Sequence, residues 1–387
     1  METLKFLMTS TFYPPYHIGG DAVHVNYLAE ELARRGHEVH VMFSMDAYRL
    51  KRKDRPQGEK VGKVQLHPLV SPYGRLSPMK AYTFGNSKFI LKQYRKLVED
   101  KKPDIVHHHN ISLLGHDILK KMGSYRQIYT AHDYWLVCQR NDLMRKGVVC
   151  TERLCNSCAV SSLKPPQTWR KGMKFEEIDC VICPSQYMKS KLSNLDRPTV
   201  VIPNFVPKPP DEIGKVSDSG YFLYLGVLEP HKGIRELIKA FTKNNQRLKV
   251  AGKGSLSEFV SREIEQHGVG HRIEYMGWTE DKWAVIKGAC AMILPSLWPE
   301  NSPLSVLEAM SVGTPTFCTD LGGAREIVER VSTDFIIPVN SLVERLMMIQ
   351  PPKENRANVT KVYSANYSPE KYMDRYLAIT GGGTLST

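Results

Sequence analysis

Short apolar runs alternate with segments of helical periodicity along the whole chain. Short apolar runs bounded by polar or glycine residues are typical of buried strands, and apolar positions three and four apart predict helices. In the first half the expected strands are 4–10, 38–43, 104–108, 127–130, 180–183 and 200–202. In the second half they are 221–225, 248–251, 273–275, 291–294, 316–318 and 335–336. Because strands that alternate with helices form parallel sheets, the pattern predicts an α/β protein with two doubly wound sheets.

At 387 residues the chain is longer than one ordinary domain, so we expect two domains of similar size. A proline-rich segment at 203–210 would link them. We place the first domain at 1–205 and the second at 206–365, and we expect a helix at 368–379 within a C-terminal segment, 366–387, that ends in a loose tail. The pattern therefore predicts two Rossmann-like domains with a cleft between them.

Composition narrows the class of protein. The hydrophobic fraction of 42% and the charged fraction of 24% are those of a soluble globular protein. No apolar run approaches the roughly 20 residues that a membrane span needs, and segment 1–8 predicts a first strand rather than a signal peptide. We therefore expect a cytoplasmic protein, acting in the cytoplasm or at the cytoplasmic face of the membrane. Its net charge of +13 favours an anionic partner: a lipid, a nucleic acid or a phosphorylated substrate.

Two glutamates with seven residues between them, Glu300 and Glu308, follow an apolar run that predicts a buried strand. Pro303 suits the first position of a helix with Ser302 as its N-cap, which places Glu308 two turns into a mostly buried helix. A buried carboxylate needs hydrogen-bond donors, and a helix N-terminus offers free N–H groups to a phosphate. Two acids beside an anion site favour a sugar nucleotide. The alternative is an ordinary strand–loop–helix with one exposed and one salt-bridged glutamate.

This segment resembles the E-x7-E signature of retaining glycosyltransferases, and its flanking prolines and Glu-Ala-Met run match glycosyltransferase family 4. The resemblance extends to nearly the whole chain. It implies the GT-B fold, in which two Rossmann-like domains face each other across a cleft and the C-terminal helix crosses back to the first domain. It also implies that a nucleotide-diphosphate sugar donates its sugar with retention of configuration, without a metal or a covalent nucleophile. The implied donor contacts here are Glu300 to the sugar, Glu308 to the ribose, and the helix end Asn301, Ser302, Pro303 and Leu304 to the diphosphate.

Two motifs of the first domain add to the resemblance. Gly19 and Gly20 follow the first strand and open a helix at 23–36, and paired glycines let a backbone approach a phosphate closely. The resemblance makes them the loop that faces the donor's diphosphate and sugar. It also implies that His132 hydrogen-bonds a hydroxyl of the transferred sugar, while Asp133 steadies the loop. The alternatives are an ordinary glycine turn and a histidine in a capping turn.

The loop at 224–233 resembles the one that neutralises the leaving diphosphate. Lys232 stands where the family has its lysine, but Val227 stands where the family usually has an arginine, so one of two cations is missing. The basic residues that could compensate are His231, Lys253 and Arg325. The residues of the two loops that resemble the family's nucleotide-base site are Gly252, Gly254 and Trp278.

Four of the eight cysteines form the pattern Cys138-x11-Cys150-x4-Cys155-x2-Cys158, in an insertion at about 138–160 that would shape the acceptor side of the cleft. Four soft ligands favour structural zinc, and an iron–sulfur cluster, a disulfide or free thiols remain open. The other four lie in strand patterns and are expected in the core: Cys180, Cys183, Cys290 and Cys318.

The consecutive histidines His107, His108 and His109 invite a metal interpretation. However, consecutive residues on a strand point to opposite faces of the sheet, so at least one must face away from the others. We therefore expect a structural role for the triplet, with His109 as a candidate for the cleft.

Basic residues concentrate in the first half, at 49–53, 88–96 and 164–174. Basic segments with aromatic residues are typical of a contact with a membrane surface or a lipid phosphate, although each alone also fits a solvated basic face. Together they favour a phosphorylated lipid or a membrane-bound glycan as acceptor, and peripheral association with an anionic membrane. No RNA-binding or zinc-finger signature supports a nucleic-acid partner.

The sequence therefore predicts a retaining hexosyltransferase that moves a sugar from a UDP- or GDP-sugar to a glycan or lipid-linked acceptor, in cell-surface polysaccharide or glycolipid biosynthesis. Its expected catalytic residues are His132, Lys232 and Glu300, and no cofactor is required for catalysis. Two alternatives remain open. One is a sugar-nucleotide epimerase on the same fold, and the other is a non-catalytic nucleotide-sugar-binding subunit, which Val227 favours.

Overall fold

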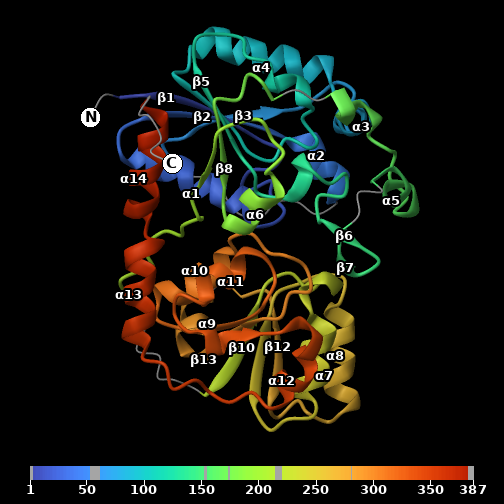
Figure 1. The fold of residues 1–387 in the computed structure, drawn as a ribbon, viewed down its shortest axis with the longest axis vertical. Helices are drawn as coiled ribbons and strands as arrows, with labels where there is room; N and C mark the ends of the chain where they lie inside the picture. Colours follow the sequence, from blue (N-terminus) through green and yellow to red (C-terminus); the bar gives the residue numbers. More distant parts are fainter. Residues whose placement is uncertain are drawn as a thin grey trace. The chain divides into compact units, whose positions relative to one another are not determined.

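The computed structural model describes residues 3–52, 62–151, 155–172, 175–213, 220–279 and 281–381 (Figure 1). The chain forms two compact units. Unit 1 comprises Met1–Leu143, Cys150–Pro203 and Met373–Thr387, and unit 2 comprises Met144–Val149 and Asn204–Tyr372. Three residues of the expected basic segments, Lys53, Met173 and Lys174, lie outside the described residues, as does most of the expected C-terminal tail.

Unit 1 is built on a seven-stranded parallel sheet in the order β3-β2-β1-β4-β5-β8-β9. Its strands are β1 (Lys5–Ser10), β2 (Glu38–Ser44), β3 (Gln65–Leu69), β4 (Ile105–His108), β5 (Arg126–Thr130), β8 (Cys180–Cys183) and β9 (Thr199–Val201). Its helices include α1 (Gly20–Arg34), α2 (Met45–Lys51), α3 (Leu76–Phe84), α4 (Lys88–Lys101), α5 (Cys155–Ser161) and α6 (Gln186–Lys191).

The six strands expected in the first half are confirmed to within two residues at each end. The predicted C-cap is also confirmed, since α1 ends at Arg34 and Gly36 takes the left-handed conformation (φ 92°). The sequence did not predict β3, whose polar Gln65-Leu66-His67-Pro68-Leu69 run is only partly buried. Pro68 is tolerated because β3 is an edge strand, where a residue without an N–H interrupts no ladder on its outer side.

Unit 2 is built on a six-stranded parallel sheet in the order β12-β11-β10-β13-β14-β15. Its strands are β10 (Tyr221–Leu225), β11 (Arg247–Ala251), β12 (Ile273–Gly277), β13 (Ala289–Leu294), β14 (Thr316–Thr319) and β15 (Ile336–Ile337), and all six were expected. Its helices are α7 (Ile234–Phe241), α8 (Ser257–Gln266), α9 (Lys282–Gly288), α10 (Leu304–Ser311), α11 (Gly322–Val328), α12 (Leu342–Met347) and α13 (Arg356–Asn366).

Each sheet reverses its strand order beside its first strand. In unit 1 the chain builds outward from β1 through β2 and β3, then returns to pair β4 with the other edge of β1. In unit 2 the same reversal places β11 and β13 on either side of β10. In open parallel sheets, ligands bind at the carboxyl ends of the strands at such a switch point. The loops after β1 and β4, and those after β10 and β13, are therefore the places to look for a site.

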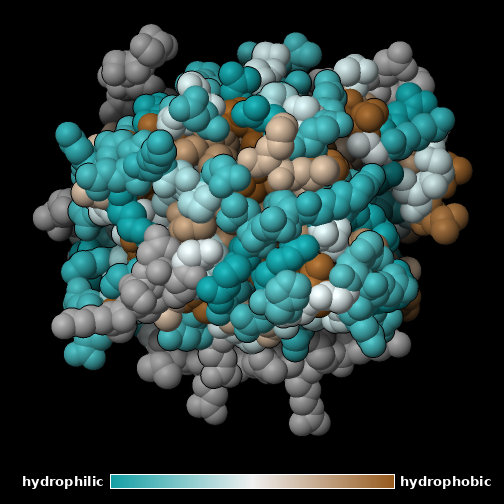
Figure 2. All heavy atoms as spheres, turned by 90° about the horizontal axis from the view of Figure 1, so that it is seen from below, coloured by the Kyte–Doolittle hydropathy of each residue, from teal (hydrophilic) through white to brown (hydrophobic). Residues whose placement is uncertain are grey.

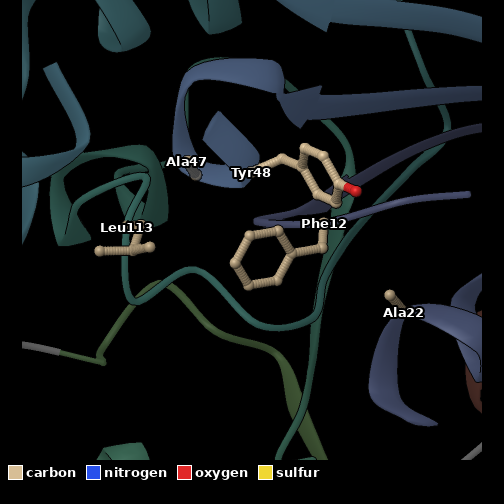
Figure 3. Close-up of a cluster of buried hydrophobic side chains, with 5 residues drawn as sticks. All are labelled: Phe12, Ala22, Ala47, Tyr48 and Leu113. Carbon is tan, nitrogen blue, oxygen red and sulfur yellow. The ribbon is translucent and has the colours of Figure 1, made fainter. Parts of the chain in front are cut away.

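A hydrophobic cluster supports the loop that follows β1 (Figure 3). Phe12 from this loop packs with Ala22 of α1, Ala47 and Tyr48 of α2, and Leu113 from the loop after β4. Three partly buried residues pack against this cluster: Tyr16 and Ile18 from the same loop, and Tyr82 from α3. The glycine turn at the start of α1 therefore stands on a packed base that two strand-end loops share.

The C-terminal helix α14 (Pro369–Thr380) matches the helix expected at 368–379. Within unit 1, a hydrogen bond of 2.9 Å joins the hydroxyl of its Tyr376 to His107 Nδ1, and its ring stacks on Phe6 of β1. The final turns of the chain are thus part of the core of unit 1.

Candidate active site

Three loops at the carboxyl ends of neighbouring strands in unit 2 are joined by backbone hydrogen bonds. Gly226 N–H after β10 donates to Ala251 at the end of β11 (3.1 Å), and Leu228 N–H donates to Lys253 (3.1 Å). Gly252 N–H donates in turn to Gly277 at the end of β12 (2.6 Å). These bonds fix the loops that carry the predicted residues as one layer above the sheet.

The predicted glycines are required by close backbone approach. A Cβ on Gly252, which has φ 141°, would lie 1.8 Å from the carbonyl oxygen of Gly226. A Cβ on Gly254 would lie 2.4 Å from that of Leu228. Gly233, at the start of α7, has φ 72°, and a Cβ added there would lie 1.8 Å from the carbonyl oxygen of Pro295. Any larger residue would push the loops apart, so these positions favour glycine for steric reasons alone.

Lys232 and Glu300 meet across the switch point of the sheet. Lys232 Nζ, from the loop after β10, donates to Glu300 Oε1, from the loop after β13, at 2.5 Å. Ser296 Oγ donates to the same oxygen at 2.7 Å. The ammonium group also lies 5.0 Å from the centre of the Trp298 ring. Burial alone would raise the pKa of Glu300, but the contacts with Lys232 and Ser296 outweigh it and lower the pKa.

The predicted cap of the following helix is wrong. Helix α10 begins at Leu304, its N-cap is Pro303 in an extended conformation, and no described side chain caps it. Ser302 lies one residue too early to reach the free N–H groups. Its Oγ instead accepts from Asn204 N–H (3.0 Å), while Asn204 Nδ2 donates to Ser302 O (2.8 Å). Ser302 thus fastens the loop to Asn204, the first residue of the longer segment of unit 2.

Glu308 is buried in α10, but it lies about one turn from the start of the helix at Leu304 rather than the two turns expected. Lys282 Nζ of α9 donates to its Oε1 at 2.7 Å. Neither glutamate is exposed and both are paired with lysine, so the ordinary arrangement with one exposed glutamate is wrong. Two paired, buried acids hold two lysines beside the free end of α10.

The structure distinguishes among the basic residues near Val227. Val227 is exposed, and the backbone of the next residue bonds to Lys253, whose side chain is also exposed. Arg325 is instead paired with Glu329 on α11 (3.2 Å), and the His231 ring lies against Trp298. Lys253 is thus the base whose backbone is joined to the loop that lacks the expected arginine. Trp278, 66% exposed, directly follows β12.

In unit 1, loops from three strand ends converge on one amide. Gly19 (φ 89°) precedes α1, so the glycine pair opens a helix as predicted, and Asp21 lies in the first turn of that helix. Asn110, after β4, donates from Nδ2 to Asp21 Oδ2 (2.9 Å) and to Asp133 Oδ2 (3.5 Å). Asp133 Oδ1 accepts from Trp135 N–H (2.8 Å) and so caps the short turn that follows β5, a contact consistent with a loop-steadying role.

Sequence reasoning missed the roles of Asp21 and Asn110. The available signal was an acid directly after a glycine pair and an amide directly after a strand. Burial raises the pKa of Asp133 to about 7 and also raises the pKa of Asp21. The carboxyl group of Asp133, which takes up a proton near neutrality, can both donate and accept hydrogen bonds.

Buried histidines extend from this group into unit 1. A hydrogen bond of 2.9 Å joins His109 Nδ1 to His132 Nε2, and the ring of His107 lies 3.9 Å from that of His109. His108 faces the other side and bonds to Thr9 Oγ1 (2.7 Å). This alternation confirms that the triplet cannot converge on one metal. Burial lowers the pKa of His132 and His108 to about 3 and lowers those of His107 and His109 well below the usual value, so the cluster is neutral.

The four clustered cysteines are all described and none forms a disulfide. Burial raises the pKa of Cys138, although backbone N–H groups of Arg140, Leu143 and Asn141 lie against its thiol. Among the described residues, no three Cys, His, Asp or Glu side chains are arranged to hold a metal ion. Metal binding by these four cysteines therefore stays a prediction. The other four cysteines are buried, as expected.

Two family models match the chain in succession. Residues 18–208 match "Glycosyltransferase Family 4" and residues 207–361 match "Glycosyl transferases group 1". The matches cover most of both units, and the chain is a member of the glycosyltransferases, related to family 4, with the GT-B fold.

Individual proteins agree with this class. An uncharacterized 42.6 kDa protein in the cps region of Klebsiella pneumoniae is 24% identical, over 96% of this chain and 100% of its own. A lipopolysaccharide 1,6-galactosyltransferase of Salmonella typhimurium is 26% identical over 64% of this chain and 67% of its own. Among solved structures, sucrose-phosphate synthase from Thermosynechococcus elongatus has a TM-score of 0.72 at 18% identity, with 97% of this chain and 98% of that chain covered. An Anabaena protein in complex with UDP-glucose has a TM-score of 0.65 at 15% identity, with 97% and 99% covered.

The neutral histidine cluster predicts steep acid lability of unit 1. Their folded-state pKa values lie below the usual value of about 6.5, so as the pH falls the unfolded chain takes up protons first and stability is lost. Each of the four histidines removes about 1.4 kcal/mol per pH unit below pH ~6.5. The raised pKa of Asp133 acts in the opposite direction between pH ~7 and ~4, and the raised pKa of Asp21 has the same sign as that of Asp133. With four histidines against two aspartates, the net result is a loss of stability as the pH falls below ~6.5, to be measured by urea unfolding at several pH values.

Replacing one buried histidine should flatten this dependence. His109→Gln removes one titrating group, so its slope should be shallower by about 1.4 kcal/mol per pH unit than that of the unaltered protein. The exposed His271→Gln is the control and should keep the full slope. A free energy of unfolding that does not change between pH ~7 and ~5.5 would contradict the neutral cluster.

Proposed function

We propose that this glycosyltransferase is a retaining hexosyltransferase that uses a UDP- or GDP-sugar and a glycan or lipid-linked acceptor in cell-surface polysaccharide or glycolipid biosynthesis. The observation that carries the proposal is the Lys232–Glu300 pair at the switch point of unit 2, beside the uncapped start of α10. The UDP-glucose complex of one structural neighbour supports the donor class. The lipopolysaccharide galactosyltransferase and the cps-region protein support the acceptor class.

Donor binding is proposed to exchange the partner of Lys232. A diphosphate is a stronger anionic acceptor than one carboxylate, so Lys232 would turn from Glu300 to the leaving phosphate. Glu300 Oε1 would then be free to accept a hydroxyl of the sugar, with Ser296 still donating to it. The N–H groups of Asn301, Ser302 and Leu304 at the start of α10 would donate to the same phosphate, while Pro303 has no N–H, and the positive end of the helix dipole would lie beside it.

The chemical step is proposed to depend on stabilising the leaving group. As the bond from the anomeric carbon to the phosphate oxygen breaks, negative charge grows on the diphosphate and is held by preorganised donors. The departing phosphate takes the proton of the acceptor hydroxyl, which attacks from the same face and so retains the configuration. Lys232 is the main cation in this scheme. The scheme calls for no metal and no covalent intermediate, as the resemblance to family 4 implies.

The neutral groups of unit 1 suit contacts with sugar hydroxyls. His132 carries no charge at neutral pH, so it can donate or accept one hydrogen bond without attracting the diphosphate. We assign it the hydroxyl contact of the transferred sugar, and we assign the loop of Gly19 and Gly20 to the donor's diphosphate and sugar. Asp133 and Asp21 keep that loop in place through Asn110.

A non-catalytic nucleotide-sugar-binding subunit is the second candidate, because Val227 removes one of the family's two cations. An epimerase on the same fold is a third. Thermal protection by a panel of sugar nucleotides, followed by product analysis, separates them. Transfer to an acceptor supports the proposal, protection without turnover indicates the subunit, and donor conversion without acceptor indicates the epimerase.

Glu308→Gln should weaken donor binding. If Glu308 accepts ribose hydroxyls, loss of its charge removes hydrogen bonds worth about 1.5–3 kcal/mol, and the donor KM should rise about 10- to 100-fold with a smaller change in kcat. The matched control is Glu274→Gln, an exposed glutamate of unit 2 paired with Lys249. An unchanged donor KM would remove Glu308 from the nucleotide site.

Lys253 should carry part of the role of the missing arginine. Lys253→Ala is expected to lower kcat by about 100-fold, because removal of one donor to a developing negative charge has an effect of that size in other enzymes. Val227→Arg in that background should restore much of the rate. Lys243→Ala, which removes an exposed lysine beyond α7, is the control. Equal kcat values for Lys253→Ala and the control would show that another group compensates or that none is needed.

A further inference from the structure

Large hydrophobic side chains are exposed in one part of unit 1. Of the twelve large hydrophobic residues that are exposed in the described part of the chain, five lie between residues 70 and 84. They are Val70, Tyr73, Leu76, Met79 and Phe84. By contrast, hydrophilic side chains predominate over the face shown in Figure 2, where apolar ones are scattered or lie near an edge. The concentration in one short segment needs an explanation of its own.

Helix α3 has the reverse of the usual amphipathic arrangement. It buries Ser77, Pro78 and Ala81 and exposes Leu76 and Met79. A surface helix of a globular protein normally turns its large apolar residues inward. Here a small inner face packs on the unit while Tyr82 anchors the helix against the Phe12 cluster. The large apolar residues are therefore held outward by the fold.

A second exposed apolar segment lies beside α3. At the end of α5, Val160 is exposed and Leu163 is 97% exposed. Gln167, a few residues on, donates from Nε2 to Tyr82 O of α3 (3.1 Å). Figure 1 shows α3 and α5 on the same side of unit 1. The two segments, 70–84 and 160–164, form what we call the apolar–basic face.

The charge of this face is positive. Residues 70–84 contain Arg75 and Lys80 and no acid, and residues 155–172 likewise contain bases but no Asp or Glu. Burial lowers the pKa of Lys164, and repulsion from Lys51 of α2 lowers it further. The neighbouring Asp46 is buried and already accepts from Ser71 N–H (2.6 Å). Arg75 and Lys80 are exposed among the apolar side chains of segment 70–84, and Asp142 is the acid that acts on Lys164.

We propose that the apolar–basic face docks unit 1 on a bilayer that contains anionic lipid, with Leu76, Met79 and Phe84 entering the headgroup region. Apolar side chains flanked by lysine and arginine match such a surface in both polarity and charge. No helix of the described residues is long and apolar enough to cross a membrane, and the proposed contact requires none. Docking does not depend on the proposed transfer reaction, but it places the protein where a lipid-linked acceptor is found.

The test is co-sedimentation of the full chain with vesicles of phosphatidylcholine alone or mixed with phosphatidylglycerol. Binding should require phosphatidylglycerol and fall as salt rises, because the basic residues act through a screened field. Arg75→Gln with Lys80→Gln should weaken binding about 30-fold, from two charges near an anionic surface. Leu76→Ser with Met79→Ser and Phe84→Ser should weaken it by at least about ten-fold at every salt concentration.

The matched control is Met347→Ser with Met348→Ser, which removes two exposed methionines of unit 2 and should bind as the unaltered protein does. Far-UV circular dichroism and protection by the sugar-nucleotide donor show whether each variant is folded, and they separate failure of docking from failure of donor binding. Two results would overturn the proposal. One is equal binding to both kinds of vesicle, or to neither. The other is a dimer in sedimentation equilibrium that the triple serine variant dissociates, which would assign the face to a second copy of the chain.

Discussion

The hydrogen bond between Lys232 and Glu300 is the constraint around which the site of unit 2 is built. An unpaired buried charge destabilises a protein by several kcal/mol, so each of these groups requires the other until a ligand replaces it. The backbone of Glu300 is fixed as well, since its carbonyl accepts from Gly323 N–H and a Cβ on Gly322 would lie 2.3 Å from it. One residue thus ties the loops after β10, β13 and β14 together. The price of this arrangement is a set of glycines that no other residue can replace without moving a loop.

The two units solve their electrostatic problems in opposite ways. Unit 2 buries two glutamates and pairs each with a partly exposed lysine, Glu300 with Lys232 and Glu308 with Lys282. Unit 1 buries titratable groups in their neutral forms, as the lowered pKa of His132 shows. Lysines that are paired with carboxylates in the absence of ligand can instead neutralise the charge of a diphosphate. Neutral imidazoles suit hydroxyl groups, which need directed donors and acceptors but no net charge.

Much of the fold could be predicted because its signals are local. Apolar runs identified every strand of the two large sheets except β3, and Gly252 and Gly254 proved to be sites of close backbone approach. What failed depends on tertiary contacts. Ser302 looked like a helix cap, but its partner is Asn204, almost a hundred residues earlier in the chain. The meeting of Asp21 and Asn110 requires knowing that β1 and β4 are neighbours, and the edge position of β3 hides its strand character behind polar residues. The roles of individual site residues in binding remain predictions.

The two hydrogen bonds of Asn204 have a mechanical consequence. Asn204 is the second residue of the proline-rich segment 203–210 and begins the longer segment of unit 2, and both its backbone and its side chain are hydrogen-bonded to Ser302. A displacement of the connecting segment is therefore transmitted to Ser302, the residue just ahead of Pro303 and α10, through these two hydrogen bonds. The segment that joins the two halves of the chain is therefore hydrogen-bonded to the loop just ahead of α10, whose N-terminus is the proposed anion site.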